Sequence, residues 1–316
     1  MRAGRLHGLT HIQTTKRFTM SHTRPPAPSC DLVVSADGTR IEVRSVGAGP
    51  GVVVVPGALS TADDYTRLAG ALSGRFTVHT IQRRGRGRSG RQGDRYRIER
   101  ECEDVEAVVH RTGARYLFGH SYGGLIVLRA AARPGSTYDR VAVYEPGVSV
   151  DGLIPMHWMP RYRSALDRRR PLEALAALSV ATGPEQARRM PIWAMRLLLP
   201  LVVDPGRRRA MMSLLEPAVH EHEQIARFDN STADYRAVTA PTLLLSGQRS
   251  RLPYVPAATA ALKAVLPDVR ALELPGLDHF GPNGAAAGRI ADVLTDFFLS
   301  GGGAAPSPRS PAGHDR

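Results

Sequence analysis

Gly119-His120-Ser121-Tyr122-Gly123 is the stretch that decides the fold of this chain. It fits the pattern G-x-S-x-G, and it follows a strand-like segment over residues 115–118 and precedes an apolar, helix-like segment over residues 124–132. A strand, a sharp turn and a helix around this pattern are typical of a nucleophile elbow. Glycines leave the turn the room it needs, because larger side chains would clash with the strand and the helix. The stretch therefore predicts that Ser121 is a nucleophile raised clear of a sheet.

A serine nucleophile needs a base, and a late histidine is the candidate. A neutral serine hydroxyl attacks poorly until a histidine takes its proton. Among the eleven histidines, His279 follows a predicted strand over residues 269–274 and precedes a predicted helix over residues 285–299. Chains with this elbow carry the serine first, then an aspartate or glutamate, then the histidine. His279 satisfies that order.

Strand and helix patterns alternate along most of the chain. The predicted elements are a hairpin over residues 31–46 turning at Asp37-Gly38, strands over 52–55, 76–81 and 140–144, and helices over 62–72 and 98–111. This alternation predicts an α/β fold, with a mostly parallel sheet flanked by helices. From residue 148 to 229 helical patterns dominate. We therefore expect a helical cap there, inserted into a core of residues 31–147 and 230–299.

The order of these segments resembles the α/β-hydrolase superfamily, in particular a bacterial subgroup with Tyr-Glu-Pro after the nucleophile helix. The matching pieces are residues 53–60, residues 83–90, the elbow, Tyr144-Glu145-Pro146, the strand at Pro241 and Asp278-His279. The resemblance covers about residues 31 to 299. It implies an α/β-hydrolase fold and a small-molecule acyl substrate, with no cofactor or metal.

The acid that orients the histidine is expected from an unusual place. Many members of that superfamily carry an aspartate where this chain has Ser250. A serine cannot hold a charge opposite an imidazolium. Glu145 ends the strand after the nucleophile helix, on the rim where open α/β sheets gather their chemistry and where Ser121 is also expected. We therefore predict Glu145 as the acid, with Asp278 and Asp151 as alternatives.

The resemblance also implies an oxyanion hole made of two backbone amides. One is that of Ala58, in the loop after the first buried strand, with Leu59 as the neighbouring alternative because Pro56 replaces the usual histidine. The other is that of Tyr122, the residue after the nucleophile.

Arginine dominates the charge of the chain. The 316 residues carry a net charge of +13 and a pI of about 10.6, with Lys16 and Lys263 as the only lysines. The arginines are scattered rather than clustered with aromatic residues, so we expect no nucleic-acid partner. The arginine-glycine turn over residues 83–90 is interpreted as structural, with glycines for a tight backbone and arginines for surface charge.

Composition also bears on the compartment and the termini. Cys30 and Cys102 cannot build a disulfide framework, which favours the cytoplasm. Residues 1–30 lack the apolar core of a secretory signal and are expected to form a disordered leader. Residues 300–316 are expected to form a disordered tail. The most apolar run, residues 192–203, is too short to span a membrane.

The leading hypothesis is a cofactor-free serine hydrolase that cleaves a carboxylic ester or related acyl compound with an apolar group. Trp158 and Trp193 of the cap are predicted to line its pocket. C–C bond cleavage, thioester release or lyase chemistry on the same scaffold are alternatives. An inactive ligand-binding relative is another, favoured by Ser250. The pattern leaves the substrate and the oligomeric state open.

Overall fold

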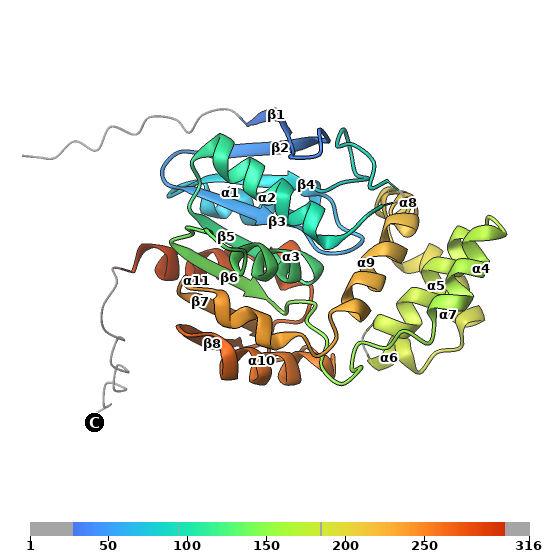
Figure 1. The fold of residues 1–316 in the computed structure, drawn as a ribbon. Coiled ribbons are helices and arrows are strands. Elements are labelled where there is room, and N and C mark those ends of the chain that lie inside the picture. The colour runs from blue at the N-terminus through green and yellow to red at the C-terminus, as the bar shows by residue number, and fades with distance from the viewer. Residues whose placement is uncertain (1–27, 94, 184, 301–316) are drawn as a thin grey trace, which may run out of the picture.

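A mixed sheet organises the structure, a computed structural model that describes residues 28–93, 95–183 and 185–300 (Figure 1). Its eight strands, in spatial order, are β1 (Ser29–Val34), β2 (Arg40–Gly47), β4 (Thr77–Gln82), β3 (Gly51–Val55), β5 (Tyr116–His120), β6 (Arg140–Tyr144), β7 (Thr242–Gly247) and β8 (Val269–Leu274). β2 runs antiparallel to β1 and β4, and the other neighbours are parallel. The predicted mostly parallel sheet is confirmed.

Helices cover both faces of the sheet. They are α1 (Thr66–Leu72) and α11 (Ala287–Leu299) on one face, and α2 (Ile98–Thr112), α3 (Tyr122–Ala131) and α10 (Tyr254–Val265) on the other. Successive side chains of a strand point to opposite faces of the sheet, so β3 contributes residues to the hydrophobic core on each face. Val53 and Val55 pack in the cluster with α2 and α3, whereas Val52 and Val54 pack in the cluster with α1 and α11.

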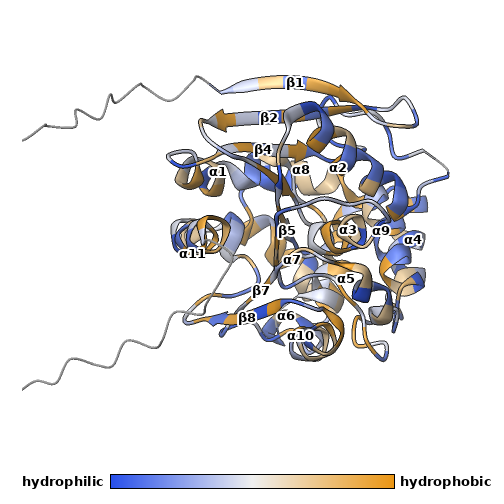
Figure 2. Ribbon diagram, turned by 60° about the vertical axis from the view of Figure 1, so that its left-hand side comes forward, coloured by the Kyte–Doolittle hydropathy of each residue, from blue (hydrophilic) through white to orange (hydrophobic). Residues whose placement is uncertain are grey.

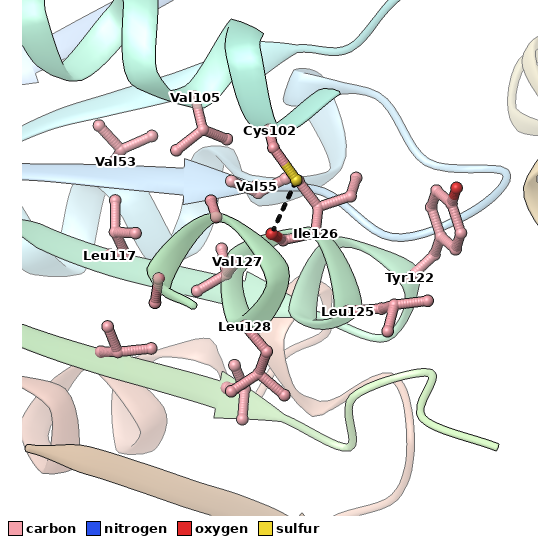
Figure 3. Packing of buried hydrophobic residues seen from close by; sticks show 14 of the residues in the cluster. Val53, Val55, Cys102, Val105, Leu117, Tyr122, Leu125, Ile126, Val127 and Leu128 are labelled. Atoms are coloured by element: carbon pink, nitrogen blue, oxygen red, sulfur yellow. Dashed lines mark hydrogen bonds between the residues drawn. The ribbon is translucent and has the colours of Figure 1, made fainter. Parts of the chain in front are cut away.

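α2 illustrates why these segments become helices that lie on a sheet. Its buried residues Ile98, Cys102, Val105 and Val108 recur at intervals of three or four and so form one face. Figure 3 shows this face over β3 and β5, with the Cys102 thiol 3.7 Å from the Ile126 carbonyl oxygen of α3. Hydrophilic positions alternate with the hydrophobic ones on the flanking helices, as Figure 2 shows for α2 and α11.

A helical insertion separates β6 from β7. It contains α4 (Met159–Asp167), α5 (Pro171–Thr182), α6 (Glu185–Arg188), α7 (Ile192–Val202), α8 (Pro205–Ser213) and α9 (Leu215–Arg227). In Figure 1, α9 lies beside the sheet, and α4, α5 and α7 stand farther out. The insertion has its own hydrophobic core, which includes Trp158, Tyr162, Leu175 and Leu199.

Short 3-10 turns and the chain ends complete the description. The turns are η1 (Ala62–Tyr65), η2 (Thr232–Ala237) and η3 (Gly281–Asn283). β1 begins at Ser29, within the stretch expected to be a leader; residues 1–27 of that stretch and residues 301–316 of the expected tail lie outside the described residues. The apolar run at residue 192 forms α7, and among the described residues no helix combines the length and apolarity needed to cross a membrane.

The prediction that the arginine-glycine turn provides surface charge is wrong for three of its four arginines; the fourth, Arg88, has a side chain that is 60% exposed. Arg83, Arg84 and Arg86 are at most 2% exposed. Each buried guanidinium reaches a carboxylate, because an unpaired charge in the interior would cost several kcal/mol. The interpretation of the glycines holds, since Gly85 and Gly87 adopt φ angles of +74° and +53° that favour glycine.

Candidate active site

Ser121 sits in a strained turn between β5 and α3. Its φ of 53° and ψ of −121° are unusual for a residue with a side chain. The flanking glycines make this turn possible. A Cβ on Gly119 would lie 2.4 Å from the Gly123 carbonyl oxygen, and a Cβ on Gly123 would lie 2.1 Å from the Val55 carbonyl oxygen. The backbone around Ser121 thus has the geometry of a nucleophile elbow.

Glu145 and His279 meet at the carboxyl end of the sheet. Glu145 directly follows β6 and is 1% exposed, while the His279 side chain is 19% exposed. Glu145 Oε2 lies 2.7 Å from His279 Nδ1. The other carboxylate oxygen, Oε1, accepts a hydrogen bond from the Gly247 amide at 2.8 Å. This arrangement fixes the imidazole orientation and leaves Nε2 as the nitrogen that can exchange a proton.

Ser250 has a part that sequence reasoning missed. It occupies the place of the usual acid, and its hydroxyl donates a hydrogen bond to Glu145 Oε2 at 2.9 Å. The two residues meet because β6 and β7 are parallel neighbours, and the segments that follow these two strands therefore leave the sheet at the same rim. Their separation of 105 residues hides this contact in the sequence.

The two alternative acids lie elsewhere. Asp278 Oδ1 accepts a hydrogen bond from the Phe280 amide at 2.9 Å, which is a local turn contact in an exposed loop. Asp151 is exposed, in a turn with a φ of 51°. Of the three candidates, Glu145 is the one that the structure brings to the His279 ring.

The loop after β3 places backbone amides next to Ser121. A Cβ on Gly57 would lie 3.2 Å from the Ser121 Cβ, so Gly57, which precedes Ala58, passes directly beside the serine. The Gly57 amide donates to the Tyr65 hydroxyl at 3.0 Å, which holds the loop in place. Tyr122 is the first residue of α3, where helical amides have no partner within the helix. Gly57 and the first turn of α3 thus flank Ser121, and the oxyanion hole of the Ala58 and Tyr122 amides stays a prediction.

Aromatic side chains fix the loop that carries His279. The Tyr144 hydroxyl donates to the Asp278 carbonyl oxygen at 2.6 Å. His120 Nε2 lies 2.8 Å from the His279 carbonyl oxygen. Sequence reasoning missed both contacts, although His120 stands in the variable position of the elbow motif and Tyr144 in the Tyr-Glu-Pro piece.

A buried cluster of charged residues contacts the loop after β3. Arg83 Nη1 donates to the Gly57 carbonyl oxygen at 3.1 Å, and the guanidinium carbon lies 4.7 Å from the centre of the Tyr122 ring. Arg83 also donates to Glu101 of α2 at 2.6 and 2.8 Å and to Glu221 of α9 at 3.0 Å. Burial disfavours its charge, but these carboxylates raise the pKa of Arg83 well above its usual value. The cluster thus connects the helical insertion to the loop after β3.

An apolar groove of about 570 Å³ lies in the insertion, next to the loop before α10. Its lining includes Trp158, Ala181 and Ile192 from the insertion and Pro253 from the loop before α10. Arg161 and Arg188 add positive charge to the lining. Pro253 precedes Tyr254, whose pKa is raised by burial and lowered in part by a hydrogen bond with the Ser121 hydroxyl. The groove lining thus includes Pro253, the residue before Tyr254, but not Ser121, Glu145 or His279.

The two tryptophans predicted to line a pocket have different surroundings. Trp158 lines the groove, and its indole Nε1 donates to the Pro155 carbonyl oxygen at 2.7 Å. Trp193, in contrast, is 64% exposed on α7 and is absent from the groove lining. Its predicted pocket role therefore needs correction, because periodicity alone does not tell which face of a helix turns inward.

Within the ranges that the structure describes, no group of three or more histidine, cysteine, aspartate or glutamate residues could hold a metal ion.

Comparisons with known proteins agree with this architecture. A family model described as "Alpha/beta hydrolase family" matches residues 52–293. A crystal structure of an alpha/beta hydrolase from Sphaerobacter thermophilus is 30% identical, with a TM-score of 0.72 over 85% of this chain and 100% of that one.

Two further proteins are each 28% identical to this chain. A 2-(acetamidomethylene)succinate hydrolase from Mesorhizobium japonicum is 28% identical over 247 residues, which is 76% of this chain and 85% of the relative. A non-heme haloperoxidase from Rhodococcus erythropolis is 28% identical over 264 residues, 78% of this chain and 92% of the relative. The sheet, the elbow and these matches together establish that the chain belongs to the alpha/beta hydrolase family.

Proposed function

We propose that the chain is a cofactor-free serine hydrolase that cleaves a carboxylic ester or related acyl compound carrying an apolar group. Ser121 is the nucleophile, His279 the general base and acid, and Glu145 the carboxylate that orients the imidazole. The observation that carries the proposal is the 2.7 Å contact between Glu145 Oε2 and His279 Nδ1, on the sheet rim that also presents Ser121. Hydrolase relatives support the same class of activity.

The geometry supports a two-stage reaction. His279 Nε2 takes the proton of the Ser121 hydroxyl while the oxygen forms a bond with the substrate carbonyl carbon. The amides of Ala58 and Tyr122 hold the negative oxygen that results. As the bond to the leaving alcohol breaks, Nε2 returns the proton to that alcohol. Water, activated by the same nitrogen, then releases the acid from Ser121.

The environment of Glu145 argues against an inactive relative. Ser250 replaces the usual acid, but its hydroxyl donates to the Glu145 carboxylate, so the site retains an acid and adds a donor to it. The apolar groove beside Trp158 supports an apolar acyl or aromatic group in the substrate.

Covalent labelling with a fluorophosphonate probe tests the proposal. We expect the wild type to be labelled and to hydrolyse p-nitrophenyl esters, and Ser121→Ala to lose both, with turnover down by roughly a million-fold. Ser213→Ala, in which an exposed serine of α8 changes, is the matched control and should keep both. A Ser121→Ala protein that folds and retains more than a few per cent of the activity would end the proposal.

A further inference from the structure

The helix α7 carries an apolar stripe that nothing in the described structure covers. Trp193, Leu197 and Leu201 are spaced by four residues and lie on one helical face, with exposures of 64%, 61% and 82%. Val202, next to Leu201, is 63% exposed. The opposite face packs inward through Met195 and Leu199, each 5% exposed. The helix therefore has two apolar faces, and only the inner face contributes to the core.

Arginines outnumber acids in the sequence around this stripe. Between residues 185 and 216 the chain contains six arginines and three acids, and one of these acids, Glu185, pairs with Arg189. Asp204 caps α8 by accepting hydrogen bonds from the Gly206 and Arg207 amides. Arg208 donates to the Pro200 and Val203 carbonyl oxygens at 3.1 and 3.2 Å, which ties α8 to the end of α7. Arg196, Arg207 and Arg209 are exposed.

We propose that the exposed stripe of α7, with the arginines beside it, docks on a lipid surface that carries negative charge. Helices that lie in a membrane interface combine an apolar face containing tryptophan and leucine with flanking basic residues. Basic residues near an anionic bilayer each add to the attraction, which extends over about a Debye length.

Charge and size favour a lipid surface over a second copy of the chain. A symmetric pair of stripes would bring the arginines of both copies together, and like charges repel. Four exposed side chains are also few for a stable dimer, which uses roughly 20–30 residues on each side. An anionic bilayer has neither obstacle. Ile192, at the start of α7, lines the apolar groove, so docking would place the groove near the lipid.

The two tryptophans provide a built-in test with the full chain and vesicles. Trp158 is 5% exposed and Trp193 is 64% exposed, so a change in emission reports mainly on Trp193. With phosphatidylcholine vesicles that contain phosphatidylglycerol, the tryptophan emission should shift to shorter wavelength and the protein should sediment together with the vesicles. Pure phosphatidylcholine should do so weakly, and high salt should weaken the binding to the anionic vesicles.

Variants separate the contributions. The double variant Leu197→Ser/Leu201→Ser should lose the shift and the sedimentation, and Arg207→Gln/Arg209→Gln should bind about tenfold more weakly. Leu32→Ser/Val34→Ser is the matched control, because these β1 residues are 42% and 62% exposed, and it should bind as the wild type does. Circular dichroism should show all three variants folded.

Three results would overturn the proposal. The first is that the wild type fails to bind anionic vesicles. The second is that the serine variant binds as well as the wild type, which would mean that charge alone explains the attraction. The third is that light scattering finds a dimer in the absence of lipid and that the serine variant abolishes it, which would make the stripe an interface between two copies.

Discussion

His120 donates a hydrogen bond from Nε2 to the carbonyl oxygen of His279, over 2.8 Å. A carbonyl can only accept, so Nε2 carries the proton and Nδ1 accepts from the Tyr65 hydroxyl at 2.6 Å. The same hydroxyl accepts from the Gly57 amide. Burial lowers the pKa of His120 well below its usual value, and the nearby His279 adds to this effect. A neutral His120 therefore couples the backbone of the proposed base to the loop after β3.

The first prediction concerns this coupling. His120→Leu should lower kcat by about tenfold, because it leaves the His279 carbonyl oxygen without its donor and loosens the base. KM should change little, since the His120 ring is buried and both of its nitrogens already have hydrogen-bond partners within the protein. His120→Gln, whose amide can donate in the direction of Nε2, should recover part of kcat in steady-state assays. Equal kcat values for the two variants would show that the hydrogen bond does not matter.

A second prediction concerns the acid. Glu145→Gln should cut turnover by roughly ten-thousand-fold, because the imidazole loses its orienting anion. The double variant Glu145→Gln/Ser250→Asp should regain part of that loss, since Ser250 already contacts the carboxylate and its position can present an acid to His279. Turnover of p-nitrophenyl esters measures both.

The single variant Ser250→Ala is the control for this series. It removes one donor to Glu145 and should cost about tenfold at most. If the double variant is no better than Glu145→Gln, the Ser250 position cannot supply an acid to His279. If Glu145→Gln is mild, another residue orients the base.

Local pattern made much of this site predictable. The elbow rests on five consecutive residues and their flanks, so its strand-turn-helix setting could be found without distant contacts. Glu145 could be placed because the end of a parallel strand is fixed in space by the sheet. The hairpin at Asp37-Gly38 and the strand at Val52 follow from turn chemistry and apolar runs in the same way.

Contacts between distant residues account for what was missed. Arg83 is buried because Glu101 and Glu221 neutralise it, and these partners lie 18 and 138 residues away. Ser250 seemed to mark a lost acid because its partner, Glu145, lies 105 residues earlier. Trp193 lies on the outer face of a helix whose only charged residue is Arg196, so hydrophobicity does not distinguish its inner face from its outer face.

A third prediction concerns the stability of the charge cluster. Glu221 is fully buried, and its Oε1 accepts from Arg83 and from Arg86 at 3.0 and 2.7 Å. Glu221→Gln should lower the free energy of unfolding by about 3 kcal/mol, because two buried guanidinium groups then share one carboxylate less. Urea denaturation measures the change.

A compensating variant separates charge from packing. Glu221→Gln/Arg86→Met removes one positive charge together with the negative one. Its loss in free energy of unfolding should therefore be smaller than the sum of the losses in the two single variants. Strict additivity would mean that the two charges do not interact, in contrast to their 2.7 Å contact.

The last prediction concerns selectivity. Ala181 lines the apolar groove, and Ala181→Phe should fill part of its roughly 570 Å³. If the groove holds the apolar acyl group, kcat/KM for long-chain p-nitrophenyl esters should fall by about tenfold to a hundredfold, because each lost methylene contact is worth about 1–3 kcal/mol. Acetyl esters, too short to enter the groove, should react as before. Ala210→Phe adds the same ring at an exposed position of α8 and should leave the whole series unchanged. An Ala181→Phe enzyme with an unaltered chain-length profile would mean that the acyl group binds elsewhere, and that Trp158 serves the core of the insertion alone.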